Sequence, residues 1–592
     1  MTPWRKAAIG TVASLAILVL AAAVALKVMV DPERLKRIAR DKAKQAWSRD
    51  LSVGDIRFEL WPLPALWVRD LRLDHPTEPP ILAATVTAEF ELLPLLIGRA
   101  RYRNVYFKDA TIQWEGTPLR VEEAVIETEA GLRDARITGS LWHNRRNVAL
   151  RAQFDDLSRL GKPGAITRGR VELDWGRAQF TASGRMPIDG TFRNPAVSVD
   201  AKGESLRPIS EFLGLELKPP APFTARFDVS EREGRIVFDK IEASLGHVKV
   251  KGDAEHTPGA RPVTRTRLTF DHLDWPRTSL DLGHPAAIPL ESPQMFRDAP
   301  FAWPLIVGLV GKSGTIDATF GTLVLRNGVA LKNLKMKAAY TDDRFDIATF
   351  ATELLGGAAT GRILLEGRKK GVRVQFDGTN LLLERWFKER GSTIAFTGGP
   401  MKVSARLTSS GNSMRELAAA ITGPFNVRMG PGRLASERAG AAEAKMTNAF
   451  SGKESREIDF ECASFALPFK AGRASASPLI GARTTASTLL TEGFVDLRVQ
   501  ELDLRGRLRG KSAKVGLAAI AGDVKITGPV RKPRMTLDET ATPKTLLRGA
   551  AAIATLGLSA VGTAIADSEE GRRNDPCEAV FVTKLPLSAA PR

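Results

Sequence analysis

Histidine and cysteine are scarce in this chain of 592 residues, which has 6 histidines and 2 cysteines. The histidines are dispersed and match neither an HExxH pattern nor the His and Cys spacing of a metal site. A GxSxG nucleophile motif is missing, and Gly311-Lys312 lacks the upstream glycine of a phosphate-binding loop because position 306 is Ile. The sequence therefore offers no candidate catalytic, cofactor-binding or metal-binding residues, and we expect a protein that is not an enzyme.

The two cysteines, Cys462 and Cys577, permit a single disulfide. Such a bond is expected if this part of the chain lies in an oxidising compartment such as the periplasm. Two unrelated thiols are the alternative, and the sequence leaves the choice open.

Long hydrophobic runs are also rare, and the outstanding one is at the start of the chain. Ala7 to Leu26 is a run of 20 uncharged residues, which as a helix would span about 30 Å, enough to cross a bilayer. A cleaved signal peptide is the alternative, with Ala23-Val24-Ala25 as its cleavage site, but a secretory apolar region usually ends sooner. We expect a retained anchor, although basic residues on both sides of it leave its orientation undecided.

An aromatic-rich cluster of basic residues is missing too, although the net charge is +19. A basic protein favours an acidic partner. Because the basic residues are scattered and no nucleic-acid motif accompanies them, anionic lipid is the better candidate and nucleic acid is not expected.

A basic helix is predicted directly after the anchor. Asp31-Pro32-Glu33 is a helix start, and the apolar spacing continues to about Asp50. Such a helix could lie on a membrane surface. A solvated helix that caps the next domain is the alternative.

From Leu51 onward the apolar residues alternate with polar ones, as in antiparallel strands with one buried face. Turn pairs separate the strands at Asn327-Gly328, Gly356-Gly357 and Asp377-Gly378. Short helices are predicted over 208–213, 383–389 and 414–421. The apolar positions of four alternating stretches are candidates to line a lipid-binding groove: Ile236, Phe238, Val248, Val250, Leu323, Leu325, Val495, Leu497 and Val499.

Two segments resemble each other. Gly190 to Asp200 and Gly528 to Asp538 share Gly, Arg, Pro and Asp at fixed offsets, and both indicate a turn that leads into a strand. This internal repeat favours a sheet of recurring hairpins. Near the end of the chain, Gly549 to Ala566 is an uncharged run rich in Ala and Gly, which indicates an interfacial or groove-plugging helix, with a buried packing helix as the alternative.

Three stretches together resemble the AsmA family of inner-membrane-anchored periplasmic proteins of Gram-negative bacteria. The first is the head of the chain, including Trp61-Pro62-Leu63-Pro64 and Leu92-Leu93-Pro94-Leu95-Leu96. The second is Met401 to Leu434, and the third is Cys462 to Asp538 with the terminal Asp575-Pro576-Cys577. The resemblance implies a role in outer-membrane biogenesis and a likeness to TamB and to bridge-like lipid transfer proteins, which are built as a repeating β-groove.

The predicted fold is mainly β: an elongated, curled antiparallel sheet that forms a repeating β-groove, with an N-terminal transmembrane helix and short amphipathic helices. The expected parts are an anchor (7–26), a basic amphipathic helix (31–50), an N-terminal and central β-groove (51–400), an AsmA-like C-terminal β region (401–540), and an apolar helix with a Cys-containing tail (541–592).

A groove of this kind could shelter acyl chains and leave headgroups in water. The expected function is non-enzymatic conduction of phospholipids from the inner membrane toward the outer membrane, by a single-pass inner-membrane protein whose bulk is periplasmic. Its partners would be phospholipids, the inner membrane, and the outer membrane or its proteins. The alternative is a periplasmic scaffold or assembly factor for outer-membrane proteins, acting through a free sheet edge.

Overall fold

The structure is a computed structural model, and part of the chain is described in it. The described residues are 50–59, 61–74, 80–96, 101–114, 117–129, 132–144, 146–160, 162–189, 193–212, 221–281, 312–325, 328–389, 394–436, 457–510, 523–531, 533–538 and 575–582, with single residues in 33–44 and 292–303. The predicted anchor (7–26), most of the predicted basic helix and the apolar run 549–566 lie outside them. The single residues described in 33–44 are helical, as predicted. Of the helices in the described part, none has the length and hydrophobicity to span a membrane.

The fold is mainly β, as predicted. The chain divides into two compact units: unit 1 contains residues 1–258 and 281–284, and unit 2 contains 259–280 and 285–592. The predicted domain boundary at residue 400 lies inside unit 2.

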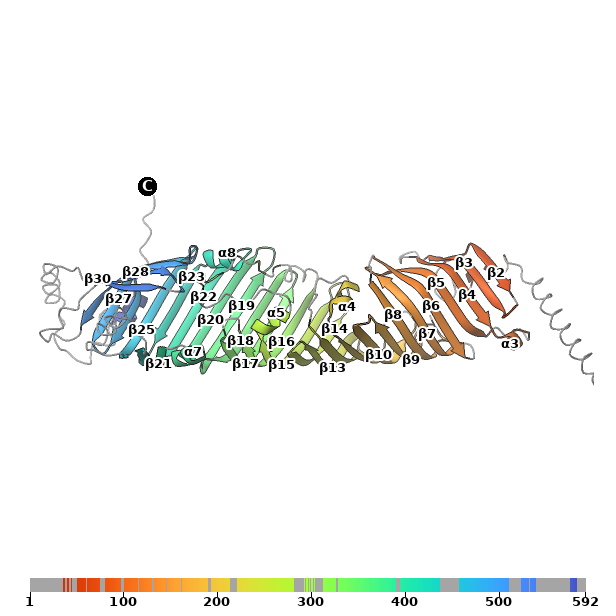
Figure 1. Ribbon diagram of the computed structural model, residues 1–592, viewed down its shortest axis with the longest axis horizontal. Coiled ribbons are helices and arrows are strands. Elements are labelled where there is room, and N and C mark those ends of the chain that lie inside the picture. Colours follow the sequence, from red (N-terminus) through yellow and green to blue (C-terminus); the bar gives the residue numbers. More distant parts are fainter. Residues whose placement is uncertain are drawn as a thin grey trace, which may run out of the picture. The chain divides into compact units, whose positions relative to one another are not determined.

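Unit 1 is an antiparallel meander (Figure 1). Its short first two strands both pair with β3, and from β3 to β14 each strand pairs with the next. The elements are β1 (Asp50–Ser52), β2 (Asp55–Glu59), β3 (Ala65–Asp74), β4 (Ile81–Phe90), α3 (Leu92–Leu96), β5 (Tyr102–Trp114), β6 (Thr117–Glu129), β7 (Arg133–His143), β8 (Arg146–Asp156), β9 (Ile166–Asp174), β10 (Ala178–Pro187), β11 (Ala196–Gly203), α4 (Arg207–Phe212), β12 (Phe223–Arg232), β13 (Arg235–Leu245) and β14 (Val248–Thr257).

Unit 2 is also built mainly of antiparallel neighbouring strands. Two of its strands are each interrupted in the middle, one between β21 and β22 and the other between β23 and β24. Gly398 and Gly399, both with positive φ, separate β21 from β22, and this pair of strands lies against β24 and β23. The elements are β15 (Val263–Asp274), α5 (Trp275–Asp281), β16 (Ser313–Val324), β17 (Ala330–Thr341), β18 (Arg344–Leu354), β19 (Gly357–Glu366), β20 (Gly371–Leu382), α7 (Leu383–Glu389), β21 (Ile394–Gly398), β22 (Pro400–Ser410), α8 (Met414–Ala419), β23 (Gly423–Met429), β24 (Gly432–Ser436), β25 (Glu457–Lys470), β26 (Arg473–Thr484), β27 (Ser487–Asp496), β28 (Glu501–Gly510), β29 (Asp523–Pro529), β30 (Arg534–Asp538) and α12 (Pro576–Val582).

The prediction of a wholly antiparallel sheet is wrong at one step, because β15 and β16 are parallel. A parallel pair needs a long crossover connection, since the chain must return to the end from which it started. Residues 275–312 provide this connection, and α5 forms its first part.

Bulges bend several strands. Lys240 in β13, Asn333 in β17 and Asn380 in β20 have φ values of 54°, 51° and 55°, and each lies where the strand register shifts. A bulge kinks its strand and increases the local twist. It also changes the phase of alternation, so that Ile236 and Ile241 share one face of β13 although they are an odd number of residues apart.

The predicted short helices are confirmed as α4, α7 and α8, whereas α3, α5 and α12 were not predicted. Gly356 lies in a turn as predicted, but the predicted turn at Asp377-Gly378 is wrong. These two residues lie inside β20 and pair with β19 and β22, and Arg406 donates to the Asp377 carboxylate at 2.7 Å. A cross-strand ion pair here favours the extended chain over a turn. Both copies of the predicted internal repeat lead into strands, β11 and β30.

The best-packed core lies in the C-terminal part of unit 2. One cluster of buried side chains contains Phe396, Met429, Ile458, Ala463, Ala482, Leu489, Leu508 and Val524. A second cluster contains Ala418, Phe469, Ala474, Val495 and Leu497. Side chains from β21 to β29 therefore fill the apolar side of the sheet in this region.

Truncation of this core should destabilise unit 2. Leu508 is 1% exposed, so we expect Leu508→Ala to lower the free energy of unfolding by about 2–5 kcal/mol through lost burial and a residual cavity. Chemical denaturation measures this loss. Leu490→Ala is the matched control, because Leu490 is 40% exposed and lies on the neighbouring strand. Equal losses in the two variants would contradict the assignment of a filled core.

Candidate functional site

Strands β11 to β14 of unit 1 have one apolar face. The register places Val229 opposite Phe238, and Leu245 lies between Phe223 and Val248 on the two neighbouring strands. Phe227 adds a ring whose centroid is 6.0 Å from that of Phe238. Side chains alternate along each strand, and the bulge at Lys240 shifts the phase of β13, so these residues all lie on the same side of the sheet.

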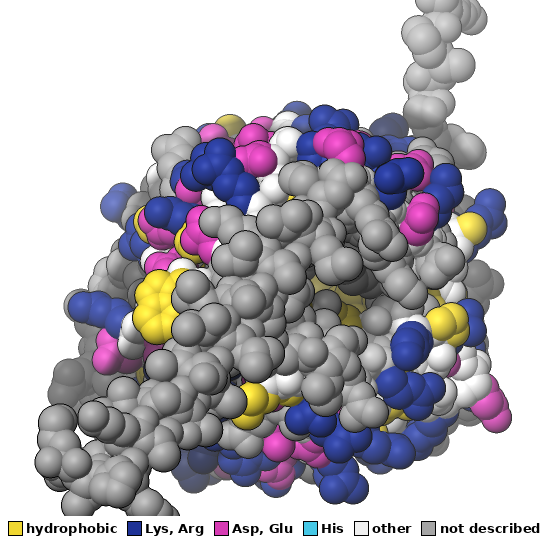
Figure 2. All heavy atoms as spheres, turned by 90° about the vertical axis from the view of Figure 1, so that its right-hand side faces the viewer, with side chains coloured by type: hydrophobic (Ala, Val, Ile, Leu, Met, Phe, Trp, Pro, Cys, Tyr) yellow, Lys and Arg dark blue, Asp and Glu magenta, His cyan; other side chains and the backbone are white. Residues whose placement is uncertain are grey.

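The opposite face of these strands is charged. Arg226 contacts Asp200 at 2.8 Å, and Lys240 contacts Asp228 at 3.0 Å. The hydrogen bond from Ser198, together with that from the Lys240 ammonium, holds the pKa of Asp228 below its usual range. Exposed ion pairs add little stability, but they keep this face in water. In the end-on view of Figure 2, charged side chains lie around the periphery, and hydrophobic side chains are visible in a recess nearer the middle.

The structure brings four of the predicted residues together on the apolar face of unit 1. Ile236 and Phe238 lie on β13, and Val248 and Val250 lie on the adjacent β14. Val248 is buried, and the other three are half-buried. The bulge at Lys240 keeps the two pairs on one face.

Unit 2 has an apolar face of its own over β15 to β20. The rings of Phe270 and Phe320 stack with centroids 4.7 Å apart, and predicted Leu323 packs against their cluster. Predicted Leu325 lies just after β16, where its backbone N–H donates to the Val329 carbonyl at 2.8 Å. Leu325 therefore begins a turn and does not extend the strand.

Aromatic rings on the apolar faces lie against glycines of the neighbouring strand. Phe154 is paired with Gly169 in unit 1, and Phe350 with Gly361 in unit 2. A Cβ atom on Gly169 would lie 2.3 Å from the Phe154 ring, and one on Gly361 would lie 2.6 Å from the Phe350 ring. Each ring therefore covers a strip of backbone that no side chain shields. Sequence reasoning missed these pairs, although a glycine inside a strand pattern often marks such a close approach.

The last three predicted residues do not line an accessible apolar face. Val495 and Leu497 are each 7% exposed and lie in the second core cluster of unit 2. Val499 is 62% exposed, in the turn after β27. The strand predicted over Val495 to Val499 ends at Asp496, whose carboxylate accepts hydrogen bonds from the backbone and guanidinium of Arg498. The hydrogen bond from the backbone N–H initiates a turn. The hydrogen bond from the guanidinium, together with that from the backbone, lowers the pKa of Asp496.

A segment of the connection between β15 and β16 covers this second core cluster. Phe296 packs against it, and the Gln500 side-chain oxygen accepts from the backbone N–H groups of Met295 and Phe296 at 2.6 and 2.9 Å. Farther along, Trp303 is 5% exposed and its indole donates to the Gly411 carbonyl at 2.8 Å. These contacts join residues 108 to 205 positions apart, which no local pattern indicates.

Helix α12 is attached to the opposite face of the C-terminal sheet. A disulfide joins Cys577 of α12 to Cys462 of β25, with Cα atoms 6.3 Å apart. Arg483 contacts Asp575 at 2.9 Å and, on β23, Arg428 contacts Glu578 at 3.3 Å. In the described part of the chain, Cys462, Asp575 and Cys577 are the one group of potential metal ligands that lie close together, and the disulfide occupies both sulfurs.

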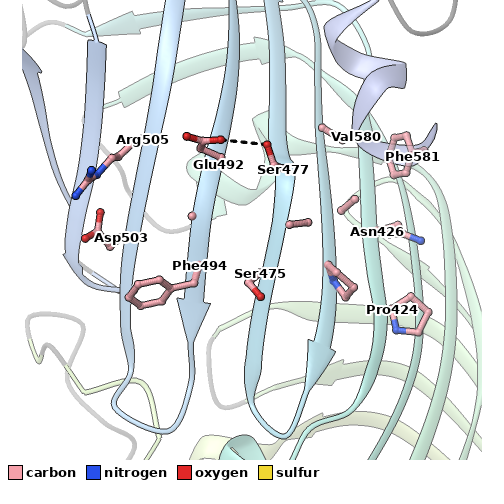
Figure 3. Close-up of a pocket in the computed structure, with 14 residues that line it drawn as sticks. Pro424, Asn426, Ser475, Ser477, Glu492, Phe494, Asp503, Arg505, Val580 and Phe581 are labelled. Carbon is pink, nitrogen blue, oxygen red and sulfur yellow. Dashed lines mark hydrogen bonds between the residues drawn. The ribbon is translucent and has the colours of Figure 1, made fainter. Parts of the chain in front are cut away.

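A pocket of about 850 Å³ lies beside α12 on that same face (Figure 3). Val580 and Phe581 of the helix form one side, and Phe494 of β27 lies farther across the sheet. Ser477 donates to Glu492 at 3.1 Å on its floor. The lining residues alternate with those of the second core cluster, so this pocket is separated from the apolar face by the sheet itself.

The comparison with protein families bears on the N-terminal part of the chain. Residues 4–115 match the model of the AsmA family. This match confirms the resemblance over the head of the chain, including β1 to β5. The other two stretches that resemble AsmA proteins, 401–434 and 462–538, lie outside it. No curated protein and no solved structure matches the chain.

The pairing of Phe350 with Gly361 can be tested by enlarging the glycine. Gly361→Val should lower the free energy of unfolding, because the new side chain overlaps the Phe350 ring and the Gln375 carbonyl oxygen. Adding Phe350→Ala should restore part of the loss, and a thermal unfolding series of the two single variants and the double variant measures the coupling. Strictly additive effects would show that the ring and the glycine do not interact.

The disulfide can be tested through the protection of α12. Cys462→Ser with Cys577→Ser should lower the free energy of unfolding by about 2–4 kcal/mol, since the bond closes a long loop. Amide hydrogen exchange in 575–582 should become faster, while exchange in β6 to β8 stays unchanged. Identical protection of α12 in the variant would mean that the ion pairs alone hold the helix.

Proposed function

We propose that this protein is a non-enzymatic lipid transport protein, which conducts phospholipids along a groove formed by the apolar faces of its sheets. The carrying observation is the half-buried state of large apolar side chains such as Ile236, Phe238 and Val250, opposite a charged outer face. Apolar surface left in contact with water is unfavourable by roughly 25 cal/mol per Å². Acyl chains would cover this surface, and their headgroups would stay at the open side of the groove.

The dimensions of unit 1 suit this cargo. The twelve strands from β3 to β14 are hydrogen-bonded in succession, and at about 4.8 Å per step they provide an apolar face on the order of 50 Å long. One leaflet of a bilayer has a hydrocarbon thickness of about 15 Å, half that of the whole core. An acyl chain could therefore lie fully on the face and move along it between equivalent apolar positions.

The filled core in the C-terminal part of unit 2 limits the route. Because side chains already occupy that side of β25 to β29, lipid bound to unit 2 would lie on the apolar face of β15 to β20 and not on these strands. The ring over Gly169 and the ring over Gly361 would each leave the apolar face of its own unit unobstructed.

The proposed setting is a single-pass inner-membrane protein with its bulk in the periplasm, which supports outer-membrane biogenesis. The apolar run at 7–26 supports an anchor, the Cys462–Cys577 disulfide suits an oxidising compartment, and the AsmA match over 4–115 agrees with both. Phospholipids and the inner membrane are the proposed partners, together with the outer membrane or its proteins.

Charges placed on the apolar face should stop transport. In Val248→Asp with Val250→Asp, two carboxylates would meet the acyl chains, and burying them is costly. We expect at least a fivefold lower rate of fluorescent phospholipid transfer from vesicles that contain the full chain to acceptor vesicles. Lys249→Asp with Lys251→Asp is the matched control, because these exposed residues occupy the charged face of the same strand. Equal rates for both variants, with both folded, would refute conduction along this face.

A periplasmic scaffold for outer-membrane proteins is the second candidate. Strand β30 pairs with β29, and no further strand is paired with it in the described part of the chain. A free edge of this kind can add a strand from another protein. Mass spectrometry of gently extracted protein separates the two candidates, because co-purified phospholipid supports conduction and its absence favours the scaffold.

A further inference from the structure

Two neighbouring connections of unit 1 expose large apolar side chains. Trp61 and Leu63, in the connection between β2 and β3, are 86% and 37% exposed. Leu92 and Leu93, at the start of α3, are 39% and 78% exposed. Loops of this size are usually polar, so four large apolar side chains in contact with water require an explanation.

The two connections lie side by side. The Phe90 backbone N–H donates to the Pro64 carbonyl at 2.8 Å, and Ala65 at the start of β3 pairs with Glu89 near the end of β4. Both connections therefore leave the sheet at the same end of adjacent strands, which places the four residues at one edge of the sheet. Trp61, Leu63, Leu92 and Leu93 are called the tip patch below.

The chemistry of the tip patch suits a bilayer surface. Tryptophan favours the interface between headgroups and acyl chains, and leucine favours the acyl region. Arg101 and Arg103 are exposed at the start of β5 next to this end of β4, and they could contact anionic headgroups. The protein as a whole is strongly basic, with a net charge of +19.

The tip patch is continuous with the apolar face of unit 1. Phe90, two residues before Leu92, is 8% exposed, and its ring centroid is 6.5 Å from that of Phe58 on β2. A lipid at the tip patch would therefore meet the apolar face directly. In sequence, Trp61 follows the end of the apolar run 7–26 by 35 residues, which keeps this end of unit 1 within reach of the same bilayer.

We propose that the tip patch inserts into the surface of a phospholipid bilayer and holds the open end of the groove against it. This inference rests on the proposed function and adds to it the place where lipid is loaded. Insertion would cover the exposed side chains of Trp61 and Leu93 and leave Arg101 at headgroup level. The membrane contact would thus involve the folded sheet as well as the predicted anchor.

The test uses the full chain in vesicles, with a polarity-sensitive fluorophore on one introduced cysteine. Trp61→Cys and Leu93→Cys place the label on the tip patch, and Leu160→Cys is the control, because Leu160 is 50% exposed in the β8–β9 connection of the same unit. Lipids with nitroxide groups on their acyl chains should quench the two tip labels at least twofold more than the control label. Equal quenching at all three positions would overturn the proposal.

Contact with a second copy of the chain is the competing explanation. In that case, the emission of the tip labels would depend on protein density in the vesicle and not on nitroxide lipids, which would also overturn the proposal. The quenching can be measured whether or not the wild-type protein transfers lipid, so the membrane contact and the proposed function can fail separately.

The loading role has its own measurement. Trp61→Ser with Leu93→Ser should slow phospholipid transfer at least threefold, and Leu160→Ser should not. If the wild-type protein transfers lipid and the tip variant does so at the same rate, the tip patch has no part in loading.

Discussion

Backbone hydrogen bonding between successive strands is the constraint on which the rest of this structure depends. Each strand satisfies its N–H and C=O groups through its neighbours, so a new strand can always be added and the sheet can become very long. The same geometry sends alternate side chains to opposite faces. A sheet of this length therefore has a long apolar face, and the protein must either fill it or cover it in some other way.

The apolar faces are covered to different extents in different parts of the two units. In the C-terminal part of unit 2, side chains from β21 to β29 pack into two clusters, and a distant segment around Phe296 completes one of them. In unit 1 and in the first strands of unit 2, many apolar side chains stay half-buried. The proposed lipid pathway follows from this contrast, because only an unfilled face has room for acyl chains.

The attachments of the C-terminal part are long-range. The disulfide and two ion pairs hold α12 to β23, β25 and β26 on the side of the sheet opposite the core clusters, while the Gln500 side chain holds the segment near Phe296. The disulfide and the Gln500 hydrogen bond join residues 115 and 205 positions apart in sequence. They make the C-terminal part of unit 2 compact.

Local patterns in the sequence were enough to predict the mainly β class, the helices at 383–389 and 414–421, and the shared face of Val248 and Val250, because alternation and helix starts involve neighbouring residues. Tertiary structure decided the rest. The parallel β15–β16 pair depends on a crossover, the phase change at Lys240 depends on a bulge, and the burial of Val495 depends on side chains brought from distant strands. The physical reason is that alternation shows which residues share a face, whereas only the packed chain shows what covers that face.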